Sequence, residues 1–168
     1  MAQLPHPVPD PCQPGQESVW SFPRPSIAQP VRNHLKIIFD GRVLAETSAG
    51  IRTIETSHPP TYYFPPTDVD LTCLRESSST SFCEWKGQAR YFDVVSHGKT
   101  SRNAAWSYPR PTPDFEAIRD YIAFYPQHMD QCLVDGEIVI PQAGQFYGGW
   151  ITSTLAGPFK GTPGTERW

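Results

Sequence analysis

The sequence predicts a mainly β domain built from antiparallel hairpins, with one α-helix and long irregular termini. Three observations support this prediction. Proline (19) and glycine (12) are frequent among 168 residues, only 18% of residues are charged, and Asp-Gly pairs separate β-prone runs twice. Frequent turn residues with few charges argue against long helices. A chain of this length suits one domain with a single core.

The chain divides into three parts. Residues 1–30 form a proline-rich arm, 31–140 the core, and 141–168 a Gly/Pro/aromatic extension that we expect to pack on the core. Each proline removes a backbone donor and fixes φ, so the arm is predicted to form neither helix nor ladder strand. Its segment Val19 to Pro23 is expected to dock through its aromatic side chains.

Two hairpins are the clearest local signals. The first joins Leu35–Phe39 to Arg42–Glu46 through Asp40-Gly41, and the second is centred on Asp135-Gly136 between Cys132 and Ile140. A two-residue type I′ turn requires positive φ at both central residues, which Asp-Gly tolerates. Together they indicate an antiparallel sheet.

Further elements follow between the hairpins. Ile51–Thr56 and Tyr62–Phe64 are predicted strands, each closed by a Pro-Pro pair. Thr67–Leu71 carries a capping-box pattern, which predicts a short helical turn. Residues Arg75–Thr80 are polar and are predicted to form a loop.

The segment Phe82–Phe92 holds a thiol, a carboxylate, an amine and several aromatic rings around one glycine. We expect a strand over Gln88–Val95 to pair with a second aromatic-rich strand over Asn103–Tyr108, across the loop Ser96–Arg102. The two strands place the chemically distinctive residues of the chain in one region.

One α-helix is predicted after these strands. Thr112 suits the N-cap and Pro113 the first helical position, and Pro126 ends the run. Apolar residues recur at helical spacing, and we expect them to pack against the sheet: Phe115, Ile118, Ile122 and Tyr125.

Charge indicates the class of ligand. The net charge is −3, so neither nucleic acid nor an anionic membrane is an expected partner. Between Glu84 and Arg110, five basic residues face two acidic ones, which gives this segment +3 and the rest −6. This local excess favours a small anionic ligand, although a solvated hairpin face explains it equally well.

The sequence shows no signal peptide and no apolar run of membrane-spanning length, which predicts a cytoplasmic protein. Its four cysteines (Cys12, Cys73, Cys83 and Cys132) are scattered, without a Cys-x-x-Cys pair. Free thiols are expected, with a Cys73–Cys83 bridge as the open alternative.

Several catalytic motifs fail on inspection. Gly98-Lys99-Thr100 lacks the preceding glycine of a P-loop, and Asp68-Val69-Asp70 lacks the turn that accompanies metal-binding carboxylate pairs. The five histidines show no metal-ligand spacing, and no nucleophile elbow is present. We therefore expect neither a metal nor a cofactor.

The remaining candidates gather around the aromatic strands. Lys86, Cys83 and Glu55 are the candidate catalytic residues, because a lysine near a thiol favours thiolate and a carboxylate can act as acid or base. The candidate ligand-binding residues are Tyr63, Glu84, Tyr91, Trp106 and Tyr108. The alternative is that Cys83 is a small buried hydrophobe, the aromatic residues are core, and Lys86 pairs with Glu84 or Glu55.

Six short segments occur in order along residues 31–140: Phe39–Gly41, Pro60–Pro65, Cys83–Tyr91, Ala105–Pro109, Tyr121–Pro126 and Asp135-Gly136. Together they resemble the domain of unknown function 427 family, also labelled nucleotidyltransferase-like. The Gly/Pro/aromatic tail is similar to that of its single-domain subgroup.

The resemblance implies a β-tent or Mss4-like fold in which sheets lean together over a pocket. It brings no known activity. Many β-tent relatives hold zinc between two Cys-x-x-Cys knuckles, which this chain lacks, so no structural zinc is expected. The family's Cys, Lys-Gly, Tyr and Trp-x-Tyr positions correspond here to Cys83, Lys86-Gly87, Tyr91 and Trp106 with Tyr108.

Three functions remain open from the sequence. The first is a domain that binds an unknown small molecule, anionic or planar, in an aromatic, locally basic pocket. The second is an enzyme that uses Lys86 or Cys83 with Glu55. The third is a protein-interaction adaptor that forms a homo-oligomer through its proline-rich arm and aromatic tail.

Overall fold

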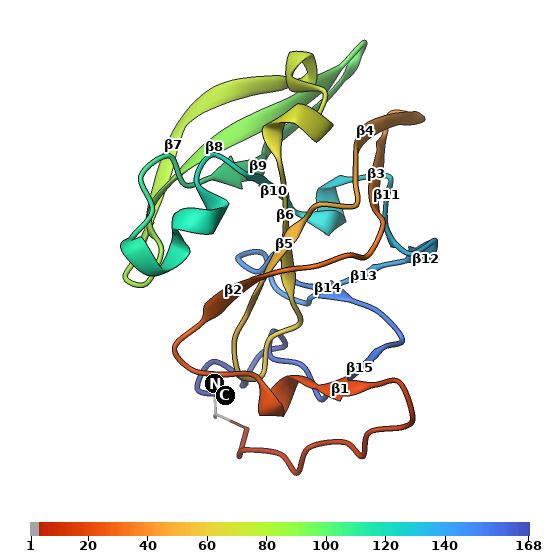
Figure 1. Ribbon diagram of the computed structural model, residues 1–168, viewed down its shortest axis with the longest axis vertical. Coiled ribbons are helices and arrows are strands. Elements are labelled where there is room, and N and C mark those ends of the chain that lie inside the picture. Colours follow the sequence, from red (N-terminus) through yellow and green to blue (C-terminus); the bar gives the residue numbers. More distant parts are fainter. Residues whose placement is uncertain (1–3) are drawn as a thin grey trace.

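The computed structural model describes residues 4–168 and has mainly β structure, as predicted. Strands of two principal antiparallel sheets dominate, and the helical segments of the described chain are short 3-10 helices. Figure 1 shows the long strands β7 (Leu74–Cys83), β8 (Gly87–Ser96) and β9 (Lys99–Ser107) on one side. The hairpin of β3 (Leu35–Phe39) and β4 (Arg42–Thr47) lies with β11 (Gln131–Val134) on the other. No helix among the described residues has the length and apolar character needed to cross a membrane.

The larger sheet has seven antiparallel strands. Their spatial order is β2 (Ile27–Pro30), β5 (Ile51–Ile54), β6 (Thr61–Phe64), β10 (Ile122–Phe124), β9 (Lys99–Ser107), β8 (Gly87–Ser96) and β7 (Leu74–Cys83). The predicted pairing of the two aromatic-rich strands is confirmed by β8 and β9. The loop between them is shorter than expected, because β9 already begins at Lys99.

The smaller sheet contains both predicted hairpins. Its order is β12 (Glu137–Ile138), β11 (Gln131–Val134), β3 (Leu35–Phe39) and β4 (Arg42–Thr47). The turn residues have positive φ, as a type I′ turn requires: 53° at Asp40, 70° at Gly41, 49° at Asp135 and 82° at Gly136.

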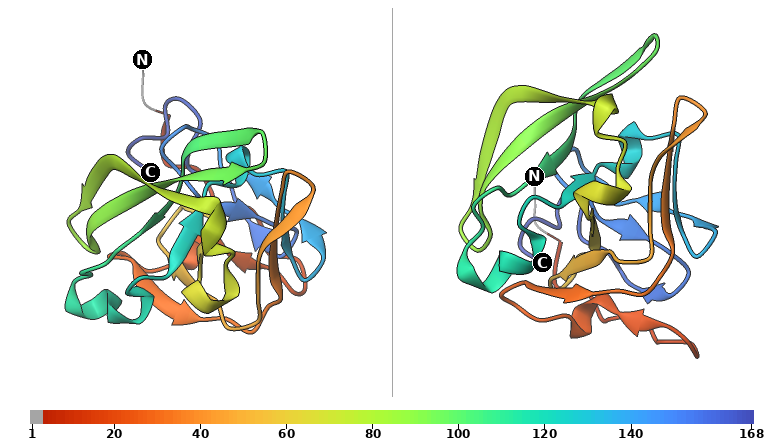
Figure 2. Two further views of the ribbon diagram at one scale, coloured as in Figure 1. Left: turned by 90° about the horizontal axis from the view of Figure 1, so that it is seen from above. Right: turned by 45° about the horizontal axis from the view of Figure 1, so that its top comes forward.

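The main core lies between the two sheets. Strand β3 alternates buried and half-buried residues, and its buried side chains Leu35, Ile37 and Phe39 pack in one cluster with Phe64 and Phe124 of the large sheet. Figure 2 shows the two sheets leaning toward each other from different sides of the molecule. A second cluster covers the opposite face of the large sheet and includes Tyr63, Trp106 and Tyr108.

The proline-rich arm is more ordered than expected. Residues 4–16 lack regular structure, as predicted, but β1 (Glu17–Ser18) pairs with β15 (Leu155–Ala156), and β2 pairs with β5. The expectation that no ladder strand forms here was wrong, because β2 is an edge strand that ends at Pro30, where a missing donor costs little. The 3-10 helix η1 (Val19–Ser21) buries Val19 in a third cluster, and the Trp20 indole donates to Pro158 O (2.9 Å), which confirms the predicted docking.

The C-terminal extension packs on the core. It contains β13 (Ile140–Pro141), β14 (Trp150–Ile151) and β15 within irregular backbone. Trp150 is fully buried against Tyr62 and Phe64, and Trp168 packs against Trp20 with ring centroids 5.6 Å apart.

The predicted α-helix over Thr112–Tyr125 was wrong beyond its first turns. The 3-10 helix η4 (Pro113–Ile118) forms at the predicted start, but Ile122–Phe124 is strand β10 and a second 3-10 helix, η5 (Pro126–His128), follows. Strand β10 inserts between β6 and β9, where all three of its residues are buried. Pairing on both edges and burial on both faces outweigh local helix propensity here.

Two other predictions need correction. Residues Arg75–Thr80 are part of β7, not a loop, although a bulge interrupts pairing between Glu76 and Thr80. A polar, bulged strand is typical of a sheet edge, which explains its loop-like sequence. The predicted helical turn near Thr67 exists as η2 (Pro66–Asp68) and η3 (Leu71–Cys73), but the N-cap of η3 is Asp70 rather than Thr67.

Trp150 allows a test of whether the extension is part of the core. We expect Trp150→Ala to lower the free energy of unfolding by about 3 to 5 kcal/mol, because it empties a buried aromatic site. Phe146→Ala, in the same extension but 87% exposed, is the control and should change it by less than about 1 kcal/mol. Urea unfolding measures both, and equal small effects would contradict this assignment.

Candidate functional site

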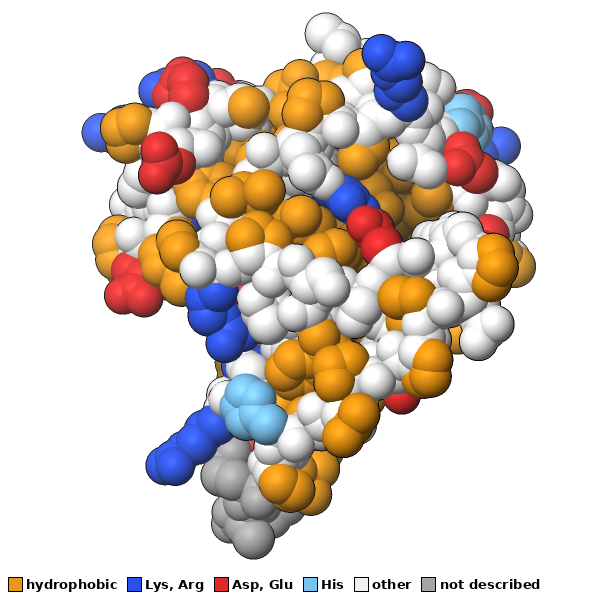
Figure 3. Space-filling view, turned by 60° about the horizontal axis from the view of Figure 1, so that its bottom comes forward, with side chains coloured by type: hydrophobic (Ala, Val, Ile, Leu, Met, Phe, Trp, Pro, Cys, Tyr) orange, Lys and Arg blue, Asp and Glu red, His pale blue; other side chains and the backbone are white. Residues whose placement is uncertain are grey.

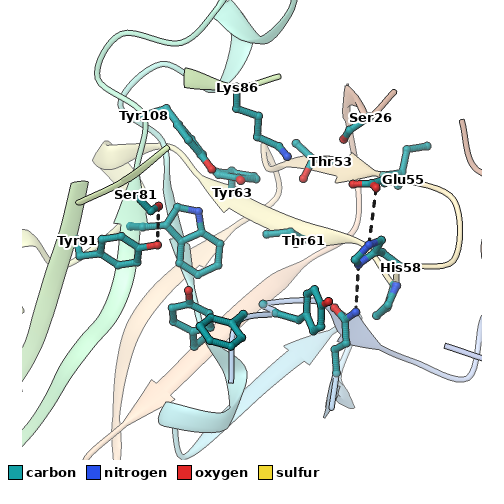
Figure 4. A pocket seen from close by; sticks show the side chains of 18 residues that line it. Ser26, Thr53, Glu55, His58, Thr61, Tyr63, Ser81, Lys86, Tyr91 and Tyr108 are labelled. Carbon is teal, nitrogen blue, oxygen red and sulfur yellow. Dashed lines mark hydrogen bonds and ion pairs between the residues drawn. The ribbon is translucent and has the colours of Figure 1, made fainter. Parts of the chain in front are cut away.

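A cavity of about 290 Å³ opens on the face of the large sheet that carries the second cluster. We call it the aromatic cup. Its walls come from six parts of the chain. They are the residue before β2 (Ser26), the β5–β6 region (Thr53, Glu55, His58, Tyr63), the β7–β8 hairpin (Ser81, Lys86, Tyr91), the end of β9 and the residue beyond it (Trp106, Tyr108), the residue after β10 (Tyr125), and the extension (Gln142, Phe146, Tyr147, Gly148). Figure 4 shows Lys86, Tyr108 and Glu55 directed toward a shared space.

Strand register produces the aromatic floor. Tyr91 lies opposite Trp106, Trp106 opposite Ala123, and Ala123 opposite Tyr63. Directly opposed residues of antiparallel strands project from the same face of a sheet. The row therefore sets three aromatic rings on one face, and Ala123 adds a small side chain among them.

Six of the eight predicted site residues line the cup: Glu55, Lys86, Tyr63, Tyr91, Trp106 and Tyr108. Cys83 and Glu84 do not. Cys83 packs half-buried against the second cluster, and Glu84 is exposed in the turn after β7. Trp106 and Tyr108 are each only 7% exposed, so they serve both as core and as cup wall.

The Lys86 side chain lies at the upper wall of the cup (Figure 4). Its ammonium is 5.4 Å from the centre of the Phe115 ring, and none of the ion pairs among residues 4–168 includes it. Its carbonyl accepts the Thr112 N–H at 3.0 Å. Gly87 has φ +106°, and a Cβ there would lie 3.1 Å from Arg110 O, so the turn that carries Lys86 requires glycine.

Glu55 is the acidic group of the cup. Its carboxylate lies 3.5 Å from the Arg24 guanidinium and 3.7 Å from His58 Nε2. Burial raises the pKa of Glu55, and the positive charges of Lys86, Arg24 and Lys160 act against that rise. Lys86 does not pair with Glu55, because none of the ion pairs of the described residues joins them, but its positive charge still acts on Glu55 across the cup.

The proton position on His58 follows from its neighbours. Gly149 N–H donates to Gln142 Oε1 (3.2 Å), so the amide nitrogen of Gln142 donates to Lys160 O (2.8 Å) and to His58 Nδ1 (3.1 Å). Nδ1 is then the acceptor, and Nε2 carries the proton toward Glu55. Burial, together with the positive charges of Lys160, Arg24 and Lys86, lowers the pKa of His58 to about 3. The imidazole is therefore neutral at pH 7.

Tyrosine hydroxyls supply the other polar groups. Burial raises the pKa of Tyr63, Tyr108 and Tyr125, so all three remain protonated. The Tyr91 hydroxyl lies 2.8 Å from Ser81 Oγ (Figure 4). The cup thus presents neutral hydroxyl groups beside one free ammonium.

Two adjacent glycines let the extension pack closely on its neighbours, and the first of them, Gly148, lines the cup. A Cβ on Gly148 would lie 2.3 Å from Trp106 Cη2, and one on Gly149 would lie 2.4 Å from Gln142 Oε1. Only glycine permits these approaches without displacement of the neighbours.

Sequence reasoning missed several cup residues, notably His58, Gln142 and Tyr125. Tyr125 was assigned to the predicted helix, and Gln142 has no local signal because its partners are distant in sequence. The one sequence signal for an acid–imidazole pair is that Glu55 and His58 lie three residues apart in the turn before Pro59-Pro60.

Acidic, basic and thiol side chains outside the cup do not form a metal-binding cluster among the described residues. Within residues 4–168, no cluster of three His, Cys, Asp or Glu side chains is suited to a metal ion, and the four cysteines are free. Asp68 accepts the Thr47 hydroxyl (2.7 Å), while Asp70 caps η3 through Thr72 N–H (3.1 Å). On the face shown in Figure 3, basic and acidic side chains are scattered among apolar ones.

The low pKa of His58 predicts acid sensitivity. The pKa of His58 is 6.5 in the unfolded chain and about 3 in the folded protein. Between these pH values only the unfolded chain binds the proton, so the free energy of unfolding falls as the pH decreases. His58→Gln should abolish this loss, about 2 kcal/mol of unfolding free energy between pH 6.5 and pH 5. The raised pKa of Glu55 acts in the opposite direction and is present in both proteins.

Urea unfolding of the wild type and His58→Gln at several pH values measures this effect. His97→Asn, at the exposed β8–β9 turn, is the control and should keep the wild-type pH dependence. Equal acid sensitivity in the wild type and His58→Gln would contradict the assignment.

Comparison with known proteins agrees with the resemblance seen in the sequence. No curated protein matched the chain. The family model described as "Domain of unknown function (DUF427)" matches residues 27–135, which is more than half of the chain and contains nearly all strands of both principal sheets. The chain therefore belongs to the DUF427 family.

Proposed function

We propose that this domain binds a small, planar organic molecule in the aromatic cup. The observation that supports this most directly is the free Lys86 ammonium, which shares a cavity with the ordered row of Tyr91, Trp106 and Tyr63. A ring with a carboxylate or similar acceptor would contact the aromatic walls and accept from the ammonium.

Size and polarity narrow the ligand class. A cavity of about 290 Å³ is at the lower limit of ligand pockets, which suits a single ring with short substituents. Neutral hydroxyls of tyrosine, serine and threonine can donate to or accept from ring substituents. Because like charges repel, the Glu55 carboxylate disfavours a ligand that places its negative charge near Glu55.

Native mass spectrometry of freshly purified protein tests the proposal. We expect a co-purified small molecule, with occupancy reduced about tenfold in Lys86→Gln because a charge-assisted hydrogen bond is lost. Lys36→Gln, on the smaller sheet, is the matched control and should retain wild-type occupancy. Equal occupancy in both variants would contradict the role of Lys86.

A second function, acid–base catalysis, is favoured by the Glu55/His58 pair. The half-buried carboxyl of Glu55 has a raised pKa, and the neutral imidazole of His58 directs its Nε2 proton toward it. Groups with shifted pKa values in a cavity are typical of catalytic acids and bases. In this alternative, Glu55 transfers a proton to or from the bound molecule and His58 is a positioning residue. Cys83, the alternative nucleophile, lies outside the cup lining.

Incubation with a metabolite extract, followed by mass spectrometry, tests catalysis. We expect at least one compound to be consumed by the wild type and its turnover to fall about 100-fold or more in Glu55→Gln. Glu46→Gln is the control, because Glu46 is an exposed carboxylate outside the cup that pairs with His34. This variant should keep full turnover. Turnover that persists in Glu55→Gln would exclude this role.

The adaptor function draws less support. The proline-rich arm that would serve it packs on its own chain, through β1 with β15 and through Leu4 N–H, which donates to Gly164 O (2.6 Å).

A further inference from the structure

A second cavity, of about 470 Å³, lies next to the aromatic cup and shares Tyr91 and Tyr125 with it. We call it the outer compartment. The Tyr125 ring also packs on Trp106 of the cup, with ring centroids 4.5 Å apart. Because Tyr91 and Tyr125 line both cavities, they form a wall that the two cavities share, which we call the Tyr91–Tyr125 ridge.

One short loop borders both cavities. Gly144 and Gln145 line the outer compartment, whereas Phe146 and Tyr147 line the cup. Gln127, which also lines the outer compartment, donates from Nε2 to Tyr147 O (3.2 Å) and ties the loop to η5. The loop is therefore a wall that continues from one cavity to the other.

The charges of the two cavities differ. The cup contains Glu55, while the outer compartment is lined by Arg102 and His128 and by no carboxylate. Arg102 is exposed, and no described carboxylate forms an ion pair with it. A guanidinium without a carboxylate partner in a hollow is suited to a carboxylate or phosphate.

Asn103 adds an independent observation. Its backbone N–H donates to Asp93 Oδ1 (2.8 Å) and its Nδ2 donates to Ser79 Oγ (3.1 Å). Its Oδ1 is buried and has no hydrogen-bond partner among the described residues. Buried acceptors are normally satisfied, so a hydroxyl or N–H donor of a ligand would complete this one.

We infer that the cup and the outer compartment form one extended site for a ligand of two parts. A planar ring occupies the cup, a hydroxyl-bearing unit crosses the Tyr91–Tyr125 ridge near Asn103, and a carboxylate or phosphate binds Arg102. This inference rests on the proposed binding function and extends it to the ligand class, a ring-bearing organic acid with hydroxyl groups.

Three probes that share a ring and a sugar test the inference. 4-Nitrophenyl β-glucoside, its glucuronide and its 6-phosphate differ only in a terminal hydroxymethyl, carboxylate or phosphate group. By calorimetry, we expect an anionic probe to bind the full-length protein about tenfold more tightly than the neutral one. The stronger of the two anions identifies the preferred acid group.

Variants separate the two cavities. Arg102→Gln should remove the advantage of the anionic probes and leave the neutral glucoside unchanged, whereas Arg110→Gln, outside both cavities, should change neither. Lys86→Gln should weaken all three probes alike. Circular dichroism and thermal melting verify that each variant is folded.

The outcomes distinguish this inference from the proposed function. Equal binding of the three probes, weakened by Lys86→Gln, would overturn the two-part site and retain the cup. An anionic advantage that persists in Arg102→Gln would also overturn it. No binding of any probe at millimolar concentration would count against both.

Discussion

The register of four neighbouring strands is the constraint on which the candidate site depends. Pairing of β8, β9, β10 and β6 aligns Tyr91, Trp106, Ala123 and Tyr63 in one row. Because side chains alternate along a strand, a slip of one residue would move a ring from this row into the main core. The opposite face of the sheet packs against the smaller sheet, and that packing holds the register. Burial of one face thus determines what the other face presents.

The parts of the fold that sequence could predict are those governed by local chemistry. Asp-Gly determines both hairpins, and the aromatic strands follow from composition and alternation. Strand β10 could not be predicted, because Ile122–Phe124 carries a helical pattern that only the neighbours β6 and β9 overrule. Strand β7 was also not predicted, because the composition of this polar edge strand is that of a loop.

The candidate site shows the same division. The cup residues in and beside the aromatic strands, such as Lys86, Tyr91 and Trp106, could be proposed from the sequence, because aromatic and ionisable side chains are concentrated there. His58 was not found, since its neutral state and its proton position depend on Gln142 and Gly149, which are more than eighty residues away in the sequence. Cys83 and Glu84 were predicted to belong to the site because they are close to Lys86 in sequence. In the structure neither lines the cup: Cys83 packs against the second cluster, and Glu84 is exposed. Long-range packing, not residue type, determines membership of the cup.

Gly148 lies beyond the residues that the family model matches, yet it lines the cup two residues before Trp150, a buried anchor of the core. The cup wall and a core anchor are therefore encoded in the same short stretch. A relative with a different tail would keep the aromatic floor but would need other residues both to close that wall and to fill the place of Trp150. Changes to the cup in this architecture are consequently coupled to changes in stability, which restricts how freely such tails can be exchanged.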